Sequence, residues 1–172
     1  HSVELDGRTF DFSADASLST GIVDKDTITY SEAWPSVDLK YQILPTGIKE
    51  DIILKNSSTQ KEFRFLVRPG GLTPVTAERG INFLDKGGNI VVRIPGPFMS
   101  DAEGNTSDDV EATWIAQADG TVLLIVHPDE DWLSKAVYPV IVDPTITLYP
   151  QTGSGSGGKD GYFTEVEAVW NY

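Results

Sequence analysis

The segment Val37-Asp-Leu-Lys-Tyr-Gln-Ile-Leu44, followed by Pro45-Thr-Gly47 and Ile48-Lys-Glu-Asp-Ile-Ile-Leu54, decides the fold expected for this chain. Apolar and polar residues alternate before the Pro-Thr-Gly turn, so every second side chain shares one face. Pro45 sets φ for a turn, and Gly47 tolerates the positive φ that reverses the chain. The segment therefore predicts a β-hairpin with a three-residue turn and one buried face.

Similar strand-sized runs recur along the chain between turns rich in Gly, Pro and Asp, which is typical of β-sandwiches and β-barrels. One short helix is predicted over 128–136, with Asp129 as its N-cap and Trp132, Leu133 and Ala136 toward the core. The fold expected is all-β, an antiparallel β-sandwich with one short helix. The predicted strands are 3–12 (a hairpin around Asp6-Gly7), 22–23, 27–30, 61–67, 81–84, 89–94, 110–116, 121–126 and 137–142.

Composition changes near the C-terminal end, where Gly and Ser dominate residues 151–158. Such a tract is typical of a flexible linker. The sequence therefore predicts a β-sandwich domain over 1–146, a Gly/Ser-rich linker over 147–161, and a terminal strand or the start of a following module over 162–172.

The charge of the chain bears on its partners. The formal net charge is −13, from 26 acidic and 13 basic residues, so the surface is expected to repel nucleic acid and anionic lipid. The longest apolar run, 121–126, is too short to span a membrane. Cysteine is absent, which excludes disulfides and thiolate metal sites. We therefore predict no nucleic-acid partner and no membrane insertion. The start at His1 suggests a processed export product, and hence an extracellular or cell-surface location.

Several motifs, in order along the chain, resemble a β-sandwich segment of secreted bacterial wall-associated and RHS (YD-repeat) proteins that precedes DNRLRE-type modules. The resemblance implies a non-catalytic extracellular β-domain, with neighbouring domains or subunits of the parent protein as partners, and it brings no catalytic residues. The motifs are Thr27-Ile-Thr-Tyr30, Trp34-Pro35, Val37-Asp-Leu39, Gly47-Ile-Lys-Glu-Asp51, Pro97-Phe-Met-Ser-Asp-Ala-Glu-Gly-Asn105 and Tyr138-Pro-Val-Ile-Val-Asp-Pro-Thr145.

One acidic segment carries side chains of the kind that calcium prefers. Carboxylate and amide oxygens are typical Ca²⁺ ligands. The alternative is a solvated hairpin turn, in which Asp and Asn side chains hydrogen-bond to the backbone and Gly adopts the φ that the turn needs. The candidate metal ligands are Asp101, Glu103, Asn105, Asp108 and Asp109.

Two tryptophans are candidates for ligand binding. Trp34 precedes Pro35 in an expected loop and Trp170 lies near the C-terminal end, so both are expected to be more exposed than Trp114 and Trp132. An exposed indole offers a flat apolar face to a sugar ring, whereas most tryptophans fill cores. These residues support an alternative function, a carbohydrate-binding module of a secreted polysaccharide-degrading enzyme, with cell-wall or extracellular polysaccharide as partner.

The two histidines suggest a remote alternative. His1 could chelate copper through its α-amine and ring, with His127 as the second ligand, as in lytic polysaccharide monooxygenases. Hydrolase motifs are absent, and the adjacent Glu50 and Asp51 cannot form a glycosidase pair because neighbouring strand residues face opposite ways. The function expected is a non-catalytic extracellular structural or adhesion module, with no enzymatic activity and no cofactor except calcium.

Overall fold

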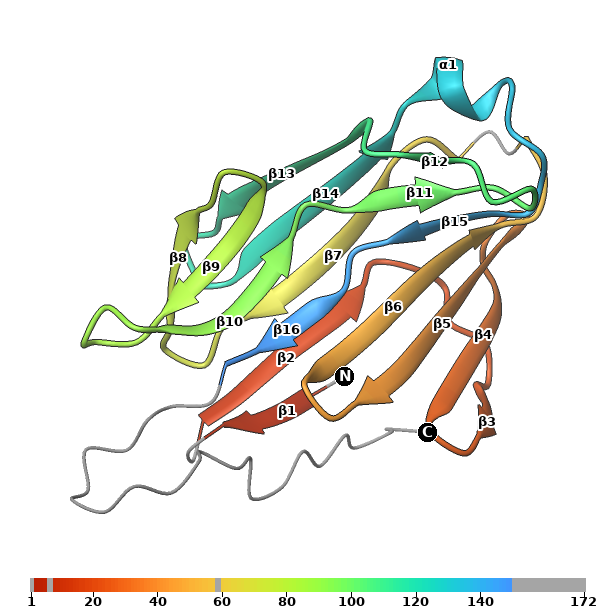
Figure 1. The fold of residues 1–172 in the computed structure, drawn as a ribbon. Coiled ribbons are helices and arrows are strands. Elements are labelled where there is room, and N and C mark those ends of the chain that lie inside the picture. Colours follow the sequence, from red (N-terminus) through yellow and green to blue (C-terminus); the bar gives the residue numbers. More distant parts are fainter. Residues whose placement is uncertain (1, 6–7, 58–59, 150–172) are drawn as a thin grey trace.

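The computed structural model describes residues 2–5, 8–57 and 60–149. In this part of the chain, antiparallel strands form two sheets that face each other, and one short helix lies at one end (Figure 1). The prediction of an all-β fold with antiparallel sheets and a single short helix is confirmed.

The smaller sheet has five strands. Its strands follow the spatial order β1 (Ser2–Leu5), β2 (Arg8–Ala14), β7 (Phe63–Arg68), β14 (Val122–Pro128) and β13 (Val110–Ala116). Strands β1 and β2 form the predicted first hairpin, and β13 pairs with β14 along seven consecutive positions.

The larger sheet has eleven strands and branches at β6 (Gly47–Leu54). On one side β6 pairs with β5, and on the other side it pairs with both β15 and β16. The chain turns between these two short strands, and the sheet continues from them in two directions. The remaining strands are β3 (Ile22–Asp24), β4 (Thr27–Trp34), β5 (Val37–Leu44), β8 (Thr73–Thr76), β9 (Gly80–Leu84), β10 (Ile90–Pro95), β11 (Phe98–Ser100), β12 (Thr106–Ser107), β15 (Val140–Asp143) and β16 (Ile146–Leu148).

The predicted central hairpin is the β5–β6 pair. Leu44 lies opposite Gly47, so only Pro45 and Thr46 connect the strands, and the expected three-residue turn is a two-residue turn. Gly47 has a φ of 151°, and a Cβ there would lie 2.0 Å from the carbonyl oxygen of Ile146. Glycine at 47 is therefore required both by the reversal and by the close approach of β16.

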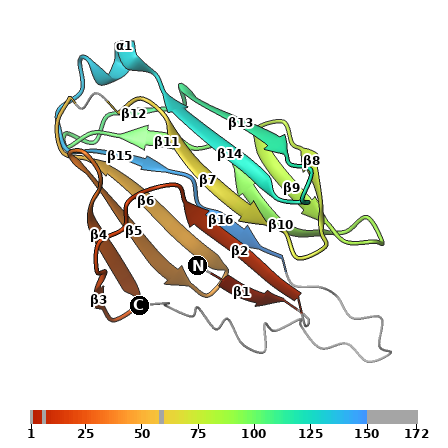
Figure 2. The same ribbon diagram turned by 180° about the vertical axis from the view of Figure 1, so that it is seen from behind.

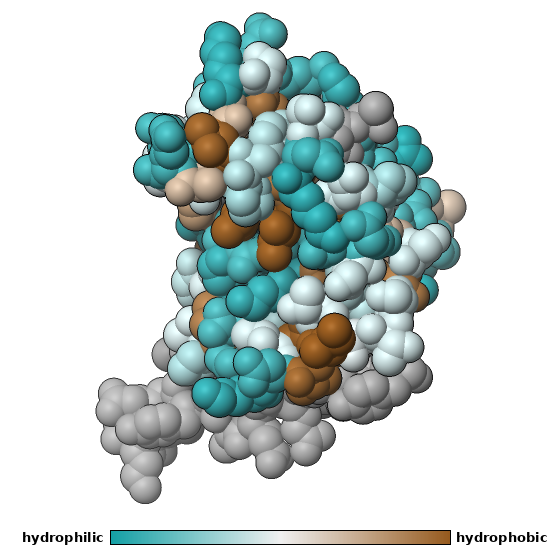
Figure 3. Space-filling model, turned by 90° about the vertical axis from the view of Figure 1, so that its right-hand side faces the viewer, coloured by the Kyte–Doolittle hydropathy of each residue, from teal (hydrophilic) through white to brown (hydrophobic). Residues whose placement is uncertain are grey.

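The core lies between the two sheets, as Figure 2 shows from behind. Aromatic rings from both layers meet there at steep angles: Phe10 of β2 packs on Phe83 of β9 with ring centroids 5.1 Å apart. Such edge-to-face packing of aromatic rings stabilises a core beyond the area that it buries. Seen from one side, the surface is mostly hydrophilic, with apolar side chains in small separate groups (Figure 3).

The helix α1 (Glu130–Leu133) is shorter than the predicted 128–136 but begins where expected. Asp129 Oδ1 accepts a hydrogen bond from the Trp132 backbone N–H at 2.7 Å, which is the predicted N-cap. Leu133 is buried. The sequence predicted neither β8 nor β16, and it indicated β11 and β12 only through the hairpin turn at residues 101–105. The predicted linker and terminal strand lie almost wholly outside the described residues. Within the residues that the structure describes, no helix has the length and apolarity that crossing a bilayer requires.

Candidate functional site

The segment with the predicted calcium ligands forms a turn that is held by its own hydrogen bonds. Asp101 Oδ1 accepts the backbone N–H groups of Glu103 (3.0 Å) and Asn105 (2.9 Å). Asp101 Oδ2 accepts Asn105 Nδ2 (3.0 Å) and the backbone N–H of Val137 (3.2 Å). These hydrogen bonds, that of the Asn105 side chain first, lower the pKa of Asp101. The geometry is that of a turn in which the Asp101 carboxylate accepts hydrogen bonds from backbone N–H groups.

The other two predicted calcium ligands have different partners. Asp108 Oδ2 forms an ion pair with Arg79 Nη1 at 2.8 Å, and Asp109 Oδ2 accepts a hydrogen bond from Ser107 Oγ at 3.0 Å. Among residues 8–57 and 60–149, no three His, Asp or Glu side chains are grouped to hold a metal ion. The five candidates are thus divided between a turn and the start of β13, and calcium binding stays a prediction.

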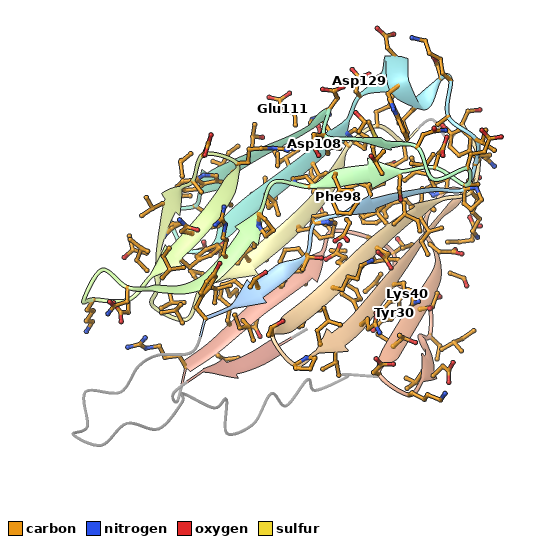
Figure 4. The ribbon with its side chains drawn as sticks, in the orientation of Figure 1. Tyr30, Lys40, Phe98, Asp108, Glu111 and Asp129 are labelled. Carbon is orange, nitrogen blue, oxygen red and sulfur yellow. The ribbon has the colours of Figure 1, made fainter. Side chains whose placement is uncertain are left out.

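An acidic hollow lies at the end of the molecule that carries α1. Its volume is about 570 Å³, and it is open to solvent. Figure 4 shows Asp108, Glu111 and Asp129 at this end, where β13 begins and β14 ends. The charge of the lining favours cations and disfavours phosphate. We call these residues the acidic hollow: Asp108, Asp109, Val110, Glu111, His127, Pro128, Asp129, Glu130 and Asp131.

His127 borders the acidic hollow and has a carboxylate partner. Its Nε2 lies 3.0 Å from Glu62 Oε2, and Glu111 lies opposite it on β13. Glu62 also pairs with Arg64, whose hydrogen bond lowers the pKa of Glu62. His127 and Glu62 therefore form a histidine–carboxylate pair at the border of the acidic hollow. His1, the other residue of the predicted copper site, lies outside the described residues.

Trp34 is not the exposed aromatic that the sequence predicted. Strand β4 continues through it, with an irregularity after Tyr30, and it pairs with Val37. Its side chain points between the sheets, with ring centroids 5.0 Å from Phe63 and 6.1 Å from Phe65. An open hollow of about 670 Å³ reaches Trp34 from outside, but the residue is only 9% exposed. It therefore presents no flat face to a sugar. Trp170 lies outside the described residues.

Sequence reasoning missed a buried carboxyl group in the core. Glu50 is 0% exposed and lies opposite Tyr41 of β5, whose hydroxyl group interacts with its carboxyl group. Desolvation raises its pKa well above the usual value, and the nearby charges of Asp143 and Asp51 act in the same direction. The alternation of β6 was the available signal, because it places Glu50 on the same face as Ile48, Ile52 and Leu54.

A polar cluster lies on the opposite face of β6. Lys49 Nζ forms an ion pair with Asp51 and lies 3.4 Å from Asp143 Oδ2. Asp143 Oδ1 also accepts the backbone N–H of Thr145 at 3.0 Å. These contacts join β6 to β15 and to the turn before β16. Their role is to hold the branch of the large sheet together.

Known proteins similar to this chain were found by sequence alone. No protein-family model matches it, and no solved structure is significantly similar to it. Three curated proteins are 31% identical to this chain in an alignment 134 residues long that covers 73% of the chain. They are the tRNA3(Ser)-specific nuclease WapA of Bacillus spizizenii, the tRNA nuclease WapA of Bacillus subtilis and the tRNA(Glu)-specific nuclease WapA of Bacillus subtilis subsp. natto. The chain spans only 6% of the length of each of these relatives.

These names overturn several predictions made from the sequence. The relatives are named tRNA nucleases, so the resemblance to a non-catalytic segment was wrong, as were the structural or adhesion function and the lack of enzymatic activity. The carbohydrate-binding alternative and the exclusion of nucleic acid as a partner are wrong for the same reason. The extracellular location is not tested by these similarities and stays a prediction.

The error has a physical origin. Net charge and the lack of a hydrolase motif describe the surface and chemistry of 172 residues. A protein in which such a segment covers 6% of the length can carry its substrate-binding surface elsewhere. The charge of a segment therefore does not determine the substrate of the protein that contains it.

Proposed function

We propose that this chain is one domain of a longer tRNA nuclease of the WapA kind, and that the longer protein cleaves tRNA. The observation that carries the proposal is the 31% identity over 134 residues to three relatives that are each named tRNA nucleases. The match covers most of the described β-sandwich, so it concerns a folded domain.

The charge of the domain supports a division of roles within the longer protein. Proteins that bind tRNA neutralise its phosphates with Lys and Arg, whereas this chain has twice as many acidic as basic residues. His127 and Glu62 form the described histidine–carboxylate pair, but the acidic hollow beside them repels phosphate. We therefore expect the tRNA-binding surface to lie in the remainder of the longer protein.

The test compares three purified proteins on end-labelled tRNA in a denaturing gel. These are the longer protein, the same protein with this domain deleted, and the isolated chain. We expect the longer protein to cleave tRNA and to leave double-stranded DNA intact. If the longer protein leaves tRNA intact under all the conditions tried, the proposal is wrong.

Two variants in the longer protein locate the cleavage chemistry. His127→Ala removes the histidine of the histidine–carboxylate pair, and Glu103→Ala is a matched control in an exposed turn. We expect both variants to cleave tRNA at the rate of the unaltered protein. A loss of activity in His127→Ala alone, together with tRNA cleavage by the isolated chain, would instead place the reaction at His127 and contradict the division of roles.

A further inference from the structure

The strand β13 is the longest free edge among the strands that the structure describes. It has seven residues and pairs only with β14. The other terminal strands are shorter: β1 and β8 have four residues, β3 has three and β12 has two, and β8 contains Pro74. In both Figure 1 and Figure 2, β13 forms the upper margin of the sandwich. An unpaired edge of this length is a template for another strand.

The register shows which backbone groups of β13 face away from β14. The Gln117 N–H donates to the Thr121 carbonyl at 2.8 Å, which makes these two residues a hydrogen-bonded pair. In an antiparallel ladder such pairs alternate with pairs whose backbone groups point outward. The N–H and C=O groups of Ala112, Trp114 and Ala116 therefore point away from β14, in the plane of the sheet. They offer three hydrogen-bond donors and three acceptors to another strand.

Three usual protections of an edge strand, namely proline, lysine and a β-bulge, are absent from β13. The sequence Val-Glu-Ala-Thr-Trp-Ile-Ala contains neither proline nor lysine, and its pairing with β14 runs without a bulge. Ile115 is 50% exposed on the outer face, opposite Leu123 of β14. Trp114 is half-buried and packs against the core. The edge is therefore regularly paired with β14 along its length, and its exposed face carries Glu111, Thr113 and Ile115.

Charge identifies the chemistry of that partner. The N-terminal end of β13 borders Asp108, Asp109 and Glu111, whereas the solvent-facing residues toward its other end are Thr113 and Ile115. A second copy of the chain, with its own net charge of −13, would be repelled by the first, so pairing of two copies along β13 is disfavoured. A strand with basic residues beside the acidic end fits instead.

We propose that β13 binds an extended segment of another polypeptide as an added antiparallel strand. Because the added strand runs in the opposite direction, its C-terminal end lies beside Asp108 and Glu111 and carries the basic residues. An aliphatic residue near its N-terminal end packs against Ile115. This mode of recognition takes its affinity from the backbone and its specificity from alternate side chains.

The test uses the whole chain and a synthetic peptide of alternating valine and threonine, with two lysines at its C-terminal end. A second peptide of the same composition carries the lysines at its N-terminal end. We expect the first peptide to bind about tenfold more tightly at low salt. Binding should slow hydrogen exchange at the amides of Ala112, Trp114 and Ala116, measured by NMR.

Two variants of the chain check the edge itself. Ala116→Pro removes an outward N–H without removing a bond to β14 and should weaken binding. Ile115→Lys places a charge on the edge and should also weaken it, whereas the matched Ile22→Lys on β3 of the other sheet should bind normally. Melting curves confirm that each variant is folded.

Three results would overturn the proposal. The first is no slowing of exchange at the three outward amides in the presence of the peptide. The second is equal binding of the two peptides, which would remove the role of the acidic end. The third is concentration-dependent self-association that Ala116→Pro abolishes, which would make a second copy the occupant of the edge.

Discussion

Replacing Glu50 with glutamine should stabilise the domain, and the gain should increase with pH. Glu50 is fully buried in the core face of β6, and desolvation raises its pKa well above 4.5. The folded state therefore retains the proton at pH values where the unfolded chain has released it. Glutamine has nearly the same shape and cannot ionise, so the variant is free of this penalty.

The sign and size of the effect follow from proton linkage. The contribution of neutral Glu50 to stability is fully present below the unfolded pKa, near 4.5, and is lost as the pH rises toward the folded pKa. Inside that window each pH unit removes up to about 1.4 kcal/mol. For a domain of this size 1 kcal/mol corresponds to about 2–4 °C in Tm. The Tm of the variant, relative to that of the unaltered chain, should therefore rise by about 3–6 °C for each pH unit.

Urea unfolding followed by tryptophan fluorescence measures both proteins at several pH values from 4 to 8. The control is Glu103→Gln, which removes one negative charge from an exposed turn position and should show no such trend. Carboxylates with lowered pKa, such as Asp101, lose their contribution below pH 3.8 and so act outside this window. A stability difference between Glu50→Gln and the unaltered chain that stays constant, or shrinks, as the pH rises would refute the reasoning.

Three further outcomes test the packing and the turns. Gly47→Ala should destabilise the domain by more than about 3 kcal/mol, because its Cβ would meet the Ile146 carbonyl oxygen, whereas Gly104→Ala, with open space and a φ of 84°, should cost about 1 kcal/mol in urea unfolding. Trp34→Ala should cost about 3–5 kcal/mol in the same assay, since it empties a buried site, and a loss below 1 kcal/mol would mean that the indole is exposed. Asp101→Ala should lower the free energy of unfolding by about 1–3 kcal/mol equally with calcium or with EDTA, because the turn is held by hydrogen bonds; a loss that appears only with calcium would mean that a bound ion holds it.

Local features of the chain were predictable because they depend on neighbours in sequence. Alternation placed β5, β6, β13 and β14 close to their observed bounds, and Asp129 caps the helix as expected. The short strands β8 and β16 were missed, and β11 and β12 were indicated only through a hairpin turn, because two to four residues carry too little periodicity. The candidate site was predicted less well, since a residue type does not reveal which partner lies beside it.

The sequence alone determined that this chain forms antiparallel strands with one short helix, because side-chain alternation and turn residues act over a few positions. Only the tertiary structure decided which strands became neighbours. It buried Trp34 between the sheets, paired His127 of β14 with Glu62 just before β7, and left β13 at the edge of its sheet. The same local pattern is compatible with many strand orders, and the choice among them rests on long-range packing of the two faces. Alternation along β6 puts Glu50 on the same face as the apolar residues, and that packing then buries its carboxyl group.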